Sequence, residues 1–314
     1  MTYKLDNPIF TNADKAREHL EAQRWADGVY CPHCGNSDKG RIAKMEGKAH
    51  RPGLYNCREC RKQFSVTVGT VFERSKIALN KWLLATYLLA SSKKGMSAHQ
   101  LHRMLGVTYK TAWFMAHRIR EAMKPVTDDA KGGLGGVGKA VEADETYVGG
   151  KAKNRAFRAP AKKEAVVSLV EREGRVRSFH VANVTAKTLK PILYTQIDRA
   201  SALMTDEALV YENLGKQFAL HGTVNHSADE YARLGGYFHT NTVENYFSIL
   251  KRGIIGTYHH VSEAHLKRYL AEFDFRHNER AALGIDDAER ANRALKGIGG
   301  KRLTYRRTNE SANA

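Results

Sequence analysis

The sequence predicts an α/β protein in which a mixed sheet covered by helices follows a small ribbon and a helical segment. Two Cys-x-x-Cys pairs occupy residues 31–60, and residues 66–125 place apolar side chains at helical spacing. Helical and strand patterns alternate after three β-rich stretches at 140–148, 164–171 and 175–184. A chain of 314 residues is long enough for about two domains with buried cores.

The composition is that of a globular protein, with 42% hydrophobic and 27% charged residues. It excludes a chain that is disordered along most of its length. A membrane protein is excluded because the longest apolar run, residues 82–90, is about half as long as a membrane span. We find no secretory signal, and four cysteines are too few for a disulfide scaffold. We therefore expect a cytoplasmic protein with no membrane partner.

Positive charge is concentrated near the start of the chain. The sequence has 51 Lys and Arg against 33 Asp and Glu, a formal net charge of +18, and residues 39–124 carry +14 of it. A segment that binds a polyphosphate backbone needs such a concentration, because each neutralised phosphate releases counterions. The alternative is a solvated face that keeps the protein soluble. We favour nucleic acid as the partner.

The patterns divide the chain into six segments. Apolar spacing near 3.6 predicts a helix in the first of them, and Pro125 ends the last helix of the third because proline lacks a backbone N–H. Five glycines in nine residues indicate a linker. The segments are a helical lead-in (1–30), a ribbon (31–65), a helical region (66–130), the linker (131–139), an α/β domain (140–285) and a basic tail (286–314) that we expect to fray.

The four cysteines predict a structural zinc site. Each Cys-x-x-Cys pair can form a knuckle that offers two thiolates, and four thiolates suit tetrahedral Zn²⁺. Gly35 permits the tight turn after the first pair. A redox motif does not explain two pairs, whereas an iron–sulfur cluster stays open as an alternative. The expected zinc ligands are Cys31, Cys34, Cys57 and Cys60.

Residues 97–123 have the pattern of two helices joined by a short turn that contains Gly106, which is typical of a helix-turn-helix. An ordinary helical hairpin is the alternative, and the positive charge favours DNA binding. The side chains that we expect to contact DNA are Lys110, Thr111, His117, Arg118 and Arg120.

Three acidic residues stand out: Asp144 within an apolar strand, Asp206 at the end of a short strand, and Glu244 on a helix. A carboxylate in such a place is unfavourable unless it binds a cation or accepts hydrogen bonds. Carboxylates suit Mg²⁺, and two such ions about 4 Å apart can promote displacement at phosphorus. Any one of these acids could instead be a cap, a salt-bridge partner or a solvated side chain. Strand alternation places Glu142 on the face of Asp144, and Glu145 on the other.

The helix that carries Glu244 also carries a cation. Lys251 follows Glu244 by seven residues, almost two turns, so both side chains lie on one face about 10 Å apart. Asn241 lies one turn before Glu244 on that face. Asn241 and His239 could contact phosphate or the metal ligands, or could only cap the helix.

These motifs resemble those of the zinc-ribbon DDE transposases of bacterial insertion sequences, in the branch known as ISXO-like. The resemblance spans roughly residues 10–285. It is carried by CPHC and CREC, by EADETYVGGK, by LMTDEALVY and, most specifically, by HTNTVENYFSILKRGIIGTYHHVSEAHLKRYLAEFDFRHNER.

The resemblance implies a ribonuclease H-like catalytic domain in which Asp144, Asp206 and Glu244 bind Mg²⁺ or Mn²⁺, as two ions. Lys251 matches the basic residue that follows the family's glutamate by seven positions. The implied chemistry is hydrolysis at the ends of the element to free 3′-hydroxyls, which then attack target DNA directly. Three further acids compete for the metal (Glu142, Glu145 and Glu207), and three residues are candidates for contacts to phosphate or to the metal ligands (His239, Asn241 and Arg252).

The expected partners are the ends of the element, target DNA and further copies of this chain. Two DNA ends must be paired, so we expect at least a dimer, associated with the bacterial nucleoid. Two alternatives stay open. One is a DNA-binding regulator with an inert catalytic fold, and the other is a nuclease that cuts without joining. The intact set of three acids with Lys251 favours the transposase.

Overall fold

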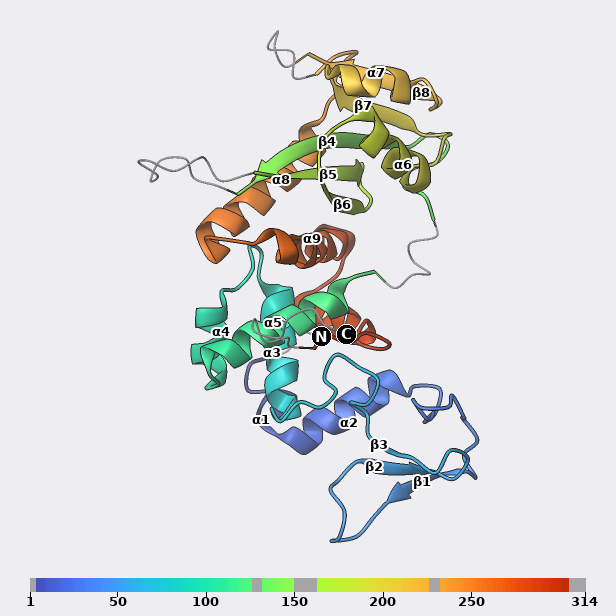
Figure 1. Cartoon of the computed structure of the whole chain (residues 1–314), viewed down its shortest axis with the longest axis vertical. Helices are drawn as coiled ribbons and strands as arrows, with labels where there is room; N and C mark the ends of the chain where they lie inside the picture. Colours follow the sequence, from blue (N-terminus) through green and yellow to red (C-terminus); the bar gives the residue numbers. More distant parts are fainter. Residues whose placement is uncertain (1–3, 126–131, 150–162, 226–231, 305–314) are drawn as a thin grey trace, which may run out of the picture. The chain divides into compact units, whose positions relative to one another are not determined.

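The computed structural model describes residues 4–125, 132–149, 163–225 and 232–304 (Figure 1). The chain forms two compact units. The ribbon unit combines residues 1–124 with 280–314, and the sheet unit consists of residues 125–279. Within the described part of the chain, we find no helix that is long and apolar enough to cross a membrane.

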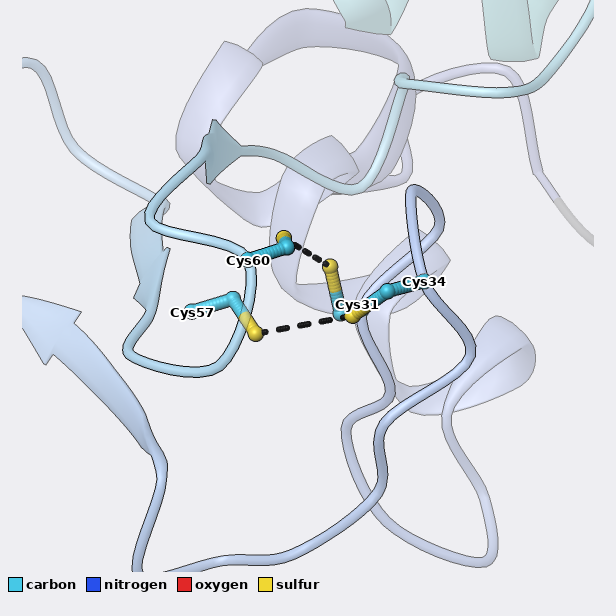
Figure 2. Close-up of side chains that lie close together, drawn as sticks. All are labelled: Cys31, Cys34, Cys57 and Cys60. Atoms are coloured by element: carbon cyan, nitrogen blue, oxygen red, sulfur yellow. Dashed lines mark hydrogen bonds between the residues drawn. The ribbon is translucent and has the colours of Figure 1, made fainter.

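A small antiparallel sheet supports the four cysteines (Figure 2). Its strands, in spatial order, are β1 (Ile42–Met45), β2 (Leu54–Cys57) and β3 (Gln63–Phe64). The rings of Tyr55 and Phe64, which are cross-strand partners, stack with their centroids 5.6 Å apart. Trp25 packs edge-on against both rings. Aromatic contacts thus form the core of a ribbon too small for an extensive aliphatic one.

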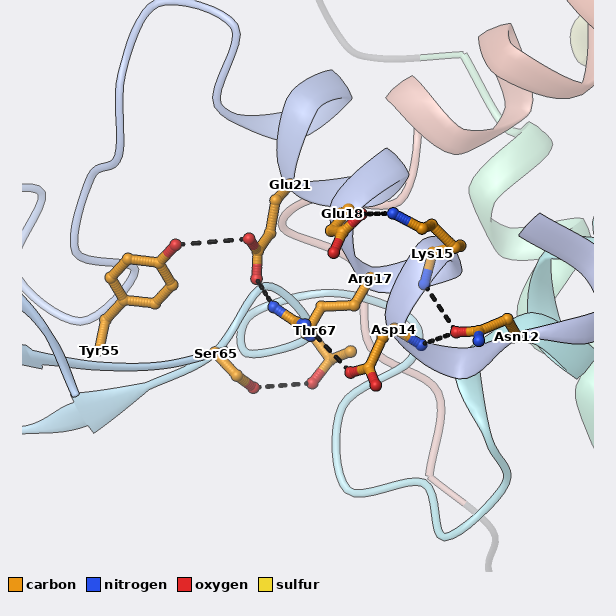
Figure 3. Close-up of polar contacts among 9 residues, drawn as sticks. All are labelled: Asn12, Asp14, Lys15, Arg17, Glu18, Glu21, Tyr55, Ser65 and Thr67. Carbon is orange, nitrogen blue, oxygen red and sulfur yellow. Dashed lines mark hydrogen bonds and ion pairs between the residues drawn. The ribbon is translucent and has the colours of Figure 1, made fainter. Parts of the chain in front are cut away.

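The predicted lead-in is packed onto this ribbon. Helix α2 (Ala13–Arg24) begins at Asn12, whose side chain accepts from the backbone N–H groups of the first turn. Arg17 lies between Asp14 and Glu21, and Glu21 accepts a hydrogen bond of 3.4 Å from the Tyr55 hydroxyl of β2 (Figure 3). Gly53 precedes β2, and a Cβ atom there would lie 2.3 Å from Arg17 Cδ. Only glycine therefore permits this close approach of α2 to the ribbon.

The rest of the ribbon unit is helical. Its other helices are α1 (Pro8–Thr11), α3 (Leu79–Ser91), α4 (Ala98–Leu105), α5 (Tyr109–Met123), the 3-10 turn η4 (Ala281–Leu283) and α10 (Asp287–Lys296). Gly106 ends α4 in the left-handed conformation, with φ of 59°, and the Thr108 side chain caps α5. The two predicted helices and their short turn are therefore present.

The prediction that residues 286–314 form a frayed tail is wrong for the described part, 286–304. Asp286 caps α10, whose buried face of Ala291, Ala294 and Leu295 belongs to a helix that packs against α3 and α5. Ile298 is also buried, and its carbonyl oxygen accepts from Val71 N at 3.1 Å. The apolar face of α10 is mostly alanine between charged residues, so the composition of this segment does not indicate that the helix is packed against others. Residues 305–314 lie outside the described residues.

The sheet unit contains one five-stranded mixed sheet, which confirms the predicted α/β arrangement. Strands β4, β5 and β6 form an antiparallel meander, and β7 and β8 run parallel to β4. The spatial order is β6-β5-β4-β7-β8. The strands are β4 (Ala140–Val148), β5 (Glu164–Glu171), β6 (Val176–Val181), β7 (Ala202–Asp206) and β8 (Leu220–Val224).

Helices cover both faces of this sheet, as Figure 1 shows. Strand alternation sends Val141 and Ala143 into the core under α6 and α7, whereas Val166 and Val170 belong to the core under α8 and α9. A π-helical turn, η3, connects α8 to the loop before α9. These elements are α6 (Ala186–Gln196), α7 (Leu209–Gly215), α8 (Asn241–Gly253), η3 (Ile254–Tyr258) and α9 (Glu263–Asn278).

The predicted linker, 131–139, is built into the sheet unit over its described residues, 132–139. Leu134 is buried, and its backbone exchanges hydrogen bonds with Gln196 and Asp198. Gly135 has φ of 86°, and a Cβ atom there would lie 2.1 Å from Ser201 Oγ. These contacts correct the prediction, since the glycines here serve close packing. Residues 126–131, including the end of the predicted helical region, lie outside the described residues.

Candidate functional site

The structure brings the four predicted zinc ligands together. All four Sγ atoms lie within 4.8 Å of one another. Cys31 Sγ is 3.7 Å from Cys60 Sγ, and Cys34 Sγ is 3.8 Å from Cys57 Sγ (Figure 2). Both pairs lie on knuckles, in which the Gly35 N–H donates to the Cys31 carbonyl and the Cys57 N–H donates to the Lys62 carbonyl.

This geometry fits zinc. With Zn–S bonds of about 2.3 Å, a tetrahedral site has sulfur atoms about 3.8 Å apart, which matches the two closest pairs. The backbone N–H of Cys60 helps to lower the pKa of the Cys57 thiol to about 6, which favours the thiolate that the metal requires. Cys31 and Cys57 are buried, so the metal is shielded on their side. The arrangement therefore fits a structural zinc ion held by the four cysteines.

A second group of ligand-type side chains is formed by β4 and β7. These strands run parallel with Ala140 beside Ala202 and Glu142 beside Met204. Continued by two residues, this register places Asp144 beside Asp206. Asp206 is the last residue of β7 and also has the parity of Met204, so both carboxylates face the side that α8 and α9 cover.

The third carboxylate, Glu244, comes from the first turn of α8. The Glu244 side chain is half-buried, and its Oε1 accepts a hydrogen bond of 2.8 Å from Thr240 Oγ1. Thr240 itself is buried and precedes the helix, so it holds the glutamate from within the protein. The first turn of a helix also stabilises negative charge, because its free N–H groups carry partial positive charge.

Asp144 lies in an acidic environment. Burial raises the pKa of Asp144 to about 7, and the charges of Glu145, Asp206 and Glu244 act in the same direction. A hydrogen bond of 2.7 Å from the Glu145 N–H to Asp144 Oδ1 opposes this rise. Neighbouring negative charges therefore disfavour the ionised form of Asp144, which a bound divalent cation would stabilise.

The spacing of the carboxylates differs from that of the cysteines. Besides the cysteines, the described residues contain one further group whose ligand atoms all lie within 4.8 Å of one another. It consists of Glu164, His180 and Glu263. In that group His180 Nε2 lies 2.8 Å from Glu164 Oε2, as in an ordinary ion pair. Asp144, Asp206 and Glu244 do not form such a group among the described residues.

The three competing acids have other surroundings. Glu142 is fully buried and accepts hydrogen bonds from Arg172 and from the first turn of α8. Glu145 points to the opposite face of the sheet, where the Tyr211 hydroxyl donates to it at 2.7 Å. Glu207 follows β7 and is exposed. Of these acids, Glu142 and Glu145 are thus occupied by protein contacts.

The predicted phosphate-contacting residues separate into two groups. Asn241, Lys251 and Arg252 are exposed on α8, and the Arg252 guanidinium donates to the carbonyl and hydroxyl of Ser248. His239 turns inward instead, because its Nδ1 lies 3.1 Å from Glu142 Oε1. That contact places His239 beside Glu142, whose carboxylate accepts hydrogen bonds from the first turn of α8.

The predicted DNA-binding residues of α5 do not share one surface. Lys110 is exposed and Thr111 is half-buried beside the cap Thr108. His117 and Arg120 are buried, so the prediction that they face DNA is wrong. Arg118 is also corrected, since it donates to the carbonyls of Glu73 and Leu303.

The exposed surface at this corner comes from α4 as well as from the start of α5. The rings of His99 and Tyr109 stack with centroids 4.3 Å apart, and Arg103 and Lys110 are exposed on the same two helices. Helical periodicity alone could not separate this surface from the opposite one. α5 is amphipathic only weakly, and α3 and α10 together determine which of its faces is covered.

Two residues of the sheet unit have roles that the sequence alone does not reveal. Glu142 competes for metal by its residue type, although its carboxylate holds α8. Arg172, which directly follows β5, donates to Glu142 and to the carbonyls of Tyr237 and His239. The parity that Glu142 shares with Asp144 is a signal for its position, whereas nothing local in the sequence points to Arg172.

Two family models match the chain. A transposase zinc-ribbon domain covers residues 11–63, and an ISXO2-like transposase domain covers residues 134–278. These ranges include the cysteines and all three carboxylates. The first range also includes α2, in agreement with its packing on the ribbon.

A relative from Halobacterium salinarum is described as an uncharacterized protein in transposable element ISH50. It is 29% identical over 286 residues, which are 85% of this chain and 91% of the relative. Two solved structures of Mos1 are also similar, a pre-cleavage transpososome and a strand transfer complex, both at 12% identity. They have TM-scores of 0.25 and 0.27, and the matches cover 64% and 68% of this chain and 70% and 74% of theirs. The chain therefore carries a transposase zinc-ribbon domain followed by an ISXO2-like transposase domain, and together with the relative these two domains support a zinc-ribbon DDE transposase of an insertion sequence.

Proposed function

We propose that this transposase cuts DNA at the ends of its insertion sequence and joins those ends to target DNA. The catalytic ligands are Asp144, Asp206 and Glu244, which hold Mg²⁺ or Mn²⁺. The observation that supports the proposal is the parallel pairing of β4 and β7, whose register, continued by two residues, would bring Asp144 beside Asp206. A ribonuclease H-like sheet order, three antiparallel strands followed by two parallel ones, supports the same assignment.

Three carboxylates on three different elements suit two metal ions. Two ions about 4 Å apart, when bound, polarise a phosphoryl group and stabilise the attacking and leaving oxygens of an in-line displacement. Asp144, Asp206 and Glu244 would hold these ions, and the charges of Asp206 and Glu244 act on Asp144.

The protein's own residues orient the DNA in this scheme. Lys251 is exposed two turns beyond Glu244 on α8, about 10 Å along the helix axis, where it can contact a backbone phosphate. Asn241 is exposed one turn before Glu244 and can donate to a second phosphate oxygen. The phosphate contacts hold the scissile bond in line, first for water and then for a 3′-hydroxyl. No covalent enzyme intermediate is required.

The ribbon unit supplies DNA binding in this proposal. Its charge excess supports contacts to the phosphate backbone, and residues 39–124 carry +14. The surface formed by His99, Arg103, Tyr109 and Lys110 supplies stacking and charged groups on two helices. Because two ends must be joined in one event, we propose that at least two copies of the chain act together.

A cleavage and joining assay tests the proposal. Purified zinc-loaded protein is incubated with Mg²⁺ and DNA that carries the ends of its own element. We expect nicking at those ends and transfer of the freed 3′-hydroxyls into a target plasmid, with both products lost in Asp206→Asn. Tight binding without cleavage would instead support the regulator, and cleavage without joining would support a nuclease.

A further inference from the structure

We infer that Glu142 is a positioning residue for the proposed metal site, because its buried carboxylate fixes the helix of Glu244 to the strand of Asp144. The inference rests on the proposed function of these carboxylates. Glu142 lies two residues before Asp144 on β4, and it contacts Thr242, which lies two residues before Glu244 on α8. A single side chain thus links the two elements within one turn of both ligands.

The contacts of Glu142 account for its carboxylate oxygens. Oε2 accepts from the backbone N–H groups of Thr242 at 2.8 Å and Val243 at 3.0 Å. Oε1 accepts from Thr242 Oγ1 at 2.9 Å and from Arg172 Nε at 2.7 Å. The side chain of Glu142 is fully buried. A carboxylate with four donors has no free direction for a metal, so Glu142 acts through the residues it holds.

Glu142 takes the place of the usual cap of α8. The residue before the helix is Thr240, whose hydroxyl caps no backbone N–H and donates to Glu244 instead. The free N–H groups of the first turn therefore depend on Glu142, which reaches them from the sheet. Its negative charge is also favourable at the positive end of the helix dipole. The helix start is thereby positioned by the sheet.

Arg172 makes this arrangement stable in a buried setting. It forms an ion pair with Glu142, and its other nitrogen atoms donate to the carbonyls of Tyr237 at 2.7 Å and His239 at 2.9 Å. The segment that leads into α8 is therefore held by the same guanidinium that neutralises Glu142. A buried carboxylate without this partner would be strongly destabilising.

The distance between Glu244 and Asp144 should therefore depend on Glu142. Groups that orient metal ligands from behind commonly change metal affinity or activity by about 10–100-fold when they are mutated. Glu142→Gln retains the size of the side chain. Its NH₂ group is a donor, however, and would replace one of the two oxygens that accept hydrogen bonds, so that donor would face donor. The first turn of α8 would shift or loosen, and the two metal-binding carboxylates would no longer be held at a fixed spacing.

Glu272 provides a matched control in the same unit. Its side chain is also fully buried, it forms an ion pair with Arg276, and it accepts from the Tyr258 hydroxyl at 2.7 Å. Glu272 lies on α9, and these two partners lie on α9 and η3, which follow α8 rather than begin it. A general loss of stability from a neutralised buried glutamate should therefore appear in Glu272→Gln as well.

The experiment measures Mn²⁺ binding by electron paramagnetic resonance and, in parallel, the Mn²⁺ dependence of end cleavage, on full-length zinc-loaded protein. For Glu142→Gln we expect at least about a tenfold rise in the Mn²⁺ concentration required for half-saturation and for half-maximal cleavage. Glu272→Gln should stay within about threefold of the wild type in both. A second variant, Thr242→Val, removes one donor to Glu142 with little change of shape, and should raise both values about threefold.

Two results would overturn the inference: equal Mn²⁺ requirements in the wild type and Glu142→Gln, or equal rises in Glu142→Gln and Glu272→Gln. The second would show a structural role alone. Failure of the proposed function itself would give a different result: Asp206→Asn would bind Mn²⁺ as the wild type does, or the wild type would not cleave.

Discussion

The cysteine site and the proposed carboxylate site differ in how the chain brings their metal ligands together. The cysteines lie on two short knuckles of a single small ribbon, and their sulfur atoms are already at tetrahedral spacing. The carboxylates come from β4, β7 and α8, and the first and last of them, Asp144 and Glu244, are 100 residues apart. A structural metal can thus be held by local turns, whereas the proposed catalytic metal would depend on a sheet and on the anchoring of a helix.

The two sites also differ in what their ligands do without metal. In the ribbon, backbone N–H groups favour the Cys57 thiolate, whereas, despite a backbone hydrogen bond from Asn36, the pKa of the Cys34 thiol is raised by desolvation and by the three other cysteines. In the sheet unit, burial and neighbouring carboxylates hold the pKa of Asp144 near 7. Zinc should therefore contribute to folding, whereas loss of the catalytic metal should leave the sheet unit folded.

The largest expected effect concerns the zinc site. Cys57→Ser should abolish zinc binding and unfold the ribbon, since structural zinc contributes on the order of 10 kcal/mol to small ribbons. Zinc content is measured by atomic absorption, and folding of each unit by limited proteolysis. His33→Ala is the control, because His33 is exposed beside Cys34 and its ring contacts the Gln63 carbonyl rather than a sulfur. An unchanged zinc content in Cys57→Ser would show that Cys57 is not a zinc ligand.

The second effect concerns the carboxylates. Asp206→Asn should reduce end cleavage by at least about 10³-fold, equivalent to roughly 4 kcal/mol of activation free energy, with no loss of thermal stability. Stability is retained because a like charge is removed from beside Asp144. Glu207→Gln, which changes the exposed neighbour, should cleave within about threefold of the wild type. A variant Asp206→Asn that unfolds would show that this carboxylate is structural.

The third effect tests whether the ribbon unit depends on the returning chain. Leu295→Ala removes a buried side chain of α10 and should lower the free energy of unfolding of this unit by about 2–4 kcal/mol. Zinc content should not change, since the ligands lie on local knuckles. Leu283→Ala, at a side chain that is 43% exposed, should change stability by less than about 1 kcal/mol. Similar losses in both variants would contradict the packing of α10.

The fourth effect is a pH dependence within the sheet unit. Burial raises the pKa of Asp274 to about 6, although Tyr246 and Ser178 donate to it. The native carboxyl keeps its proton to a higher pH than the unfolded one, so its contribution to stability is fully present below about pH 4 and lost as the pH rises through about 6.

Asp274→Asn should remove this dependence. We compare the free energy of unfolding of the wild type and the variant by urea unfolding at about pH 5 and about pH 7.5. The wild type minus variant difference should be about 1 kcal/mol larger at the lower pH. Comparing the two proteins at the same pH cancels the other titrating groups. A difference that grows toward the higher pH would show that Asp274 is charged in the native state.

The smallest effect concerns DNA affinity. Lys110→Ala should weaken binding of end DNA about threefold and reduce the slope of log affinity against log salt by about 1, as expected for one phosphate contact. Lys216→Ala, an exposed change in the sheet unit, should leave the slope unaltered. Fluorescence anisotropy at several salt concentrations gives both values. An unchanged slope in Lys110→Ala would remove α5 from the proposed interface.

Local patterns are sufficient for much of this structure. The cysteine spacing identifies the ribbon, and alternation along residues 140–148 and 164–171 predicts β4 and β5 with the observed bounds. The proposed catalytic ligands stand out by their context in strands and helices, and the family resemblance joins them into one site. In each case the signal lies within one segment of chain or in a motif.

The errors arise where a residue's surroundings come from distant segments. His117 and Arg120 are polar by type, and they are buried because α5 packs against α3 and α10. The glycines around Leu134 suggest a flexible linker. They are instead packed against residues near 197–201, at a distance that leaves no room for a side chain. The structural role of Glu142 escapes prediction because its partners Arg172 and Thr242 are 30 and 100 residues away.

Counting bound Mn²⁺ decides whether Asp144, Asp206 and Glu244 hold the catalytic metal. Zinc-loaded protein in complex with end DNA is titrated with Mn²⁺ near neutral pH, and the bound ion is followed by electron paramagnetic resonance. We expect two Mn²⁺ ions per chain in the wild type, as a two-metal site requires, with binding lost in Asp144→Asn and zinc content unchanged. Equal Mn²⁺ binding by the wild type and Asp144→Asn would contradict this expectation, because the ions would then be held somewhere other than the carboxylates of β4, β7 and α8.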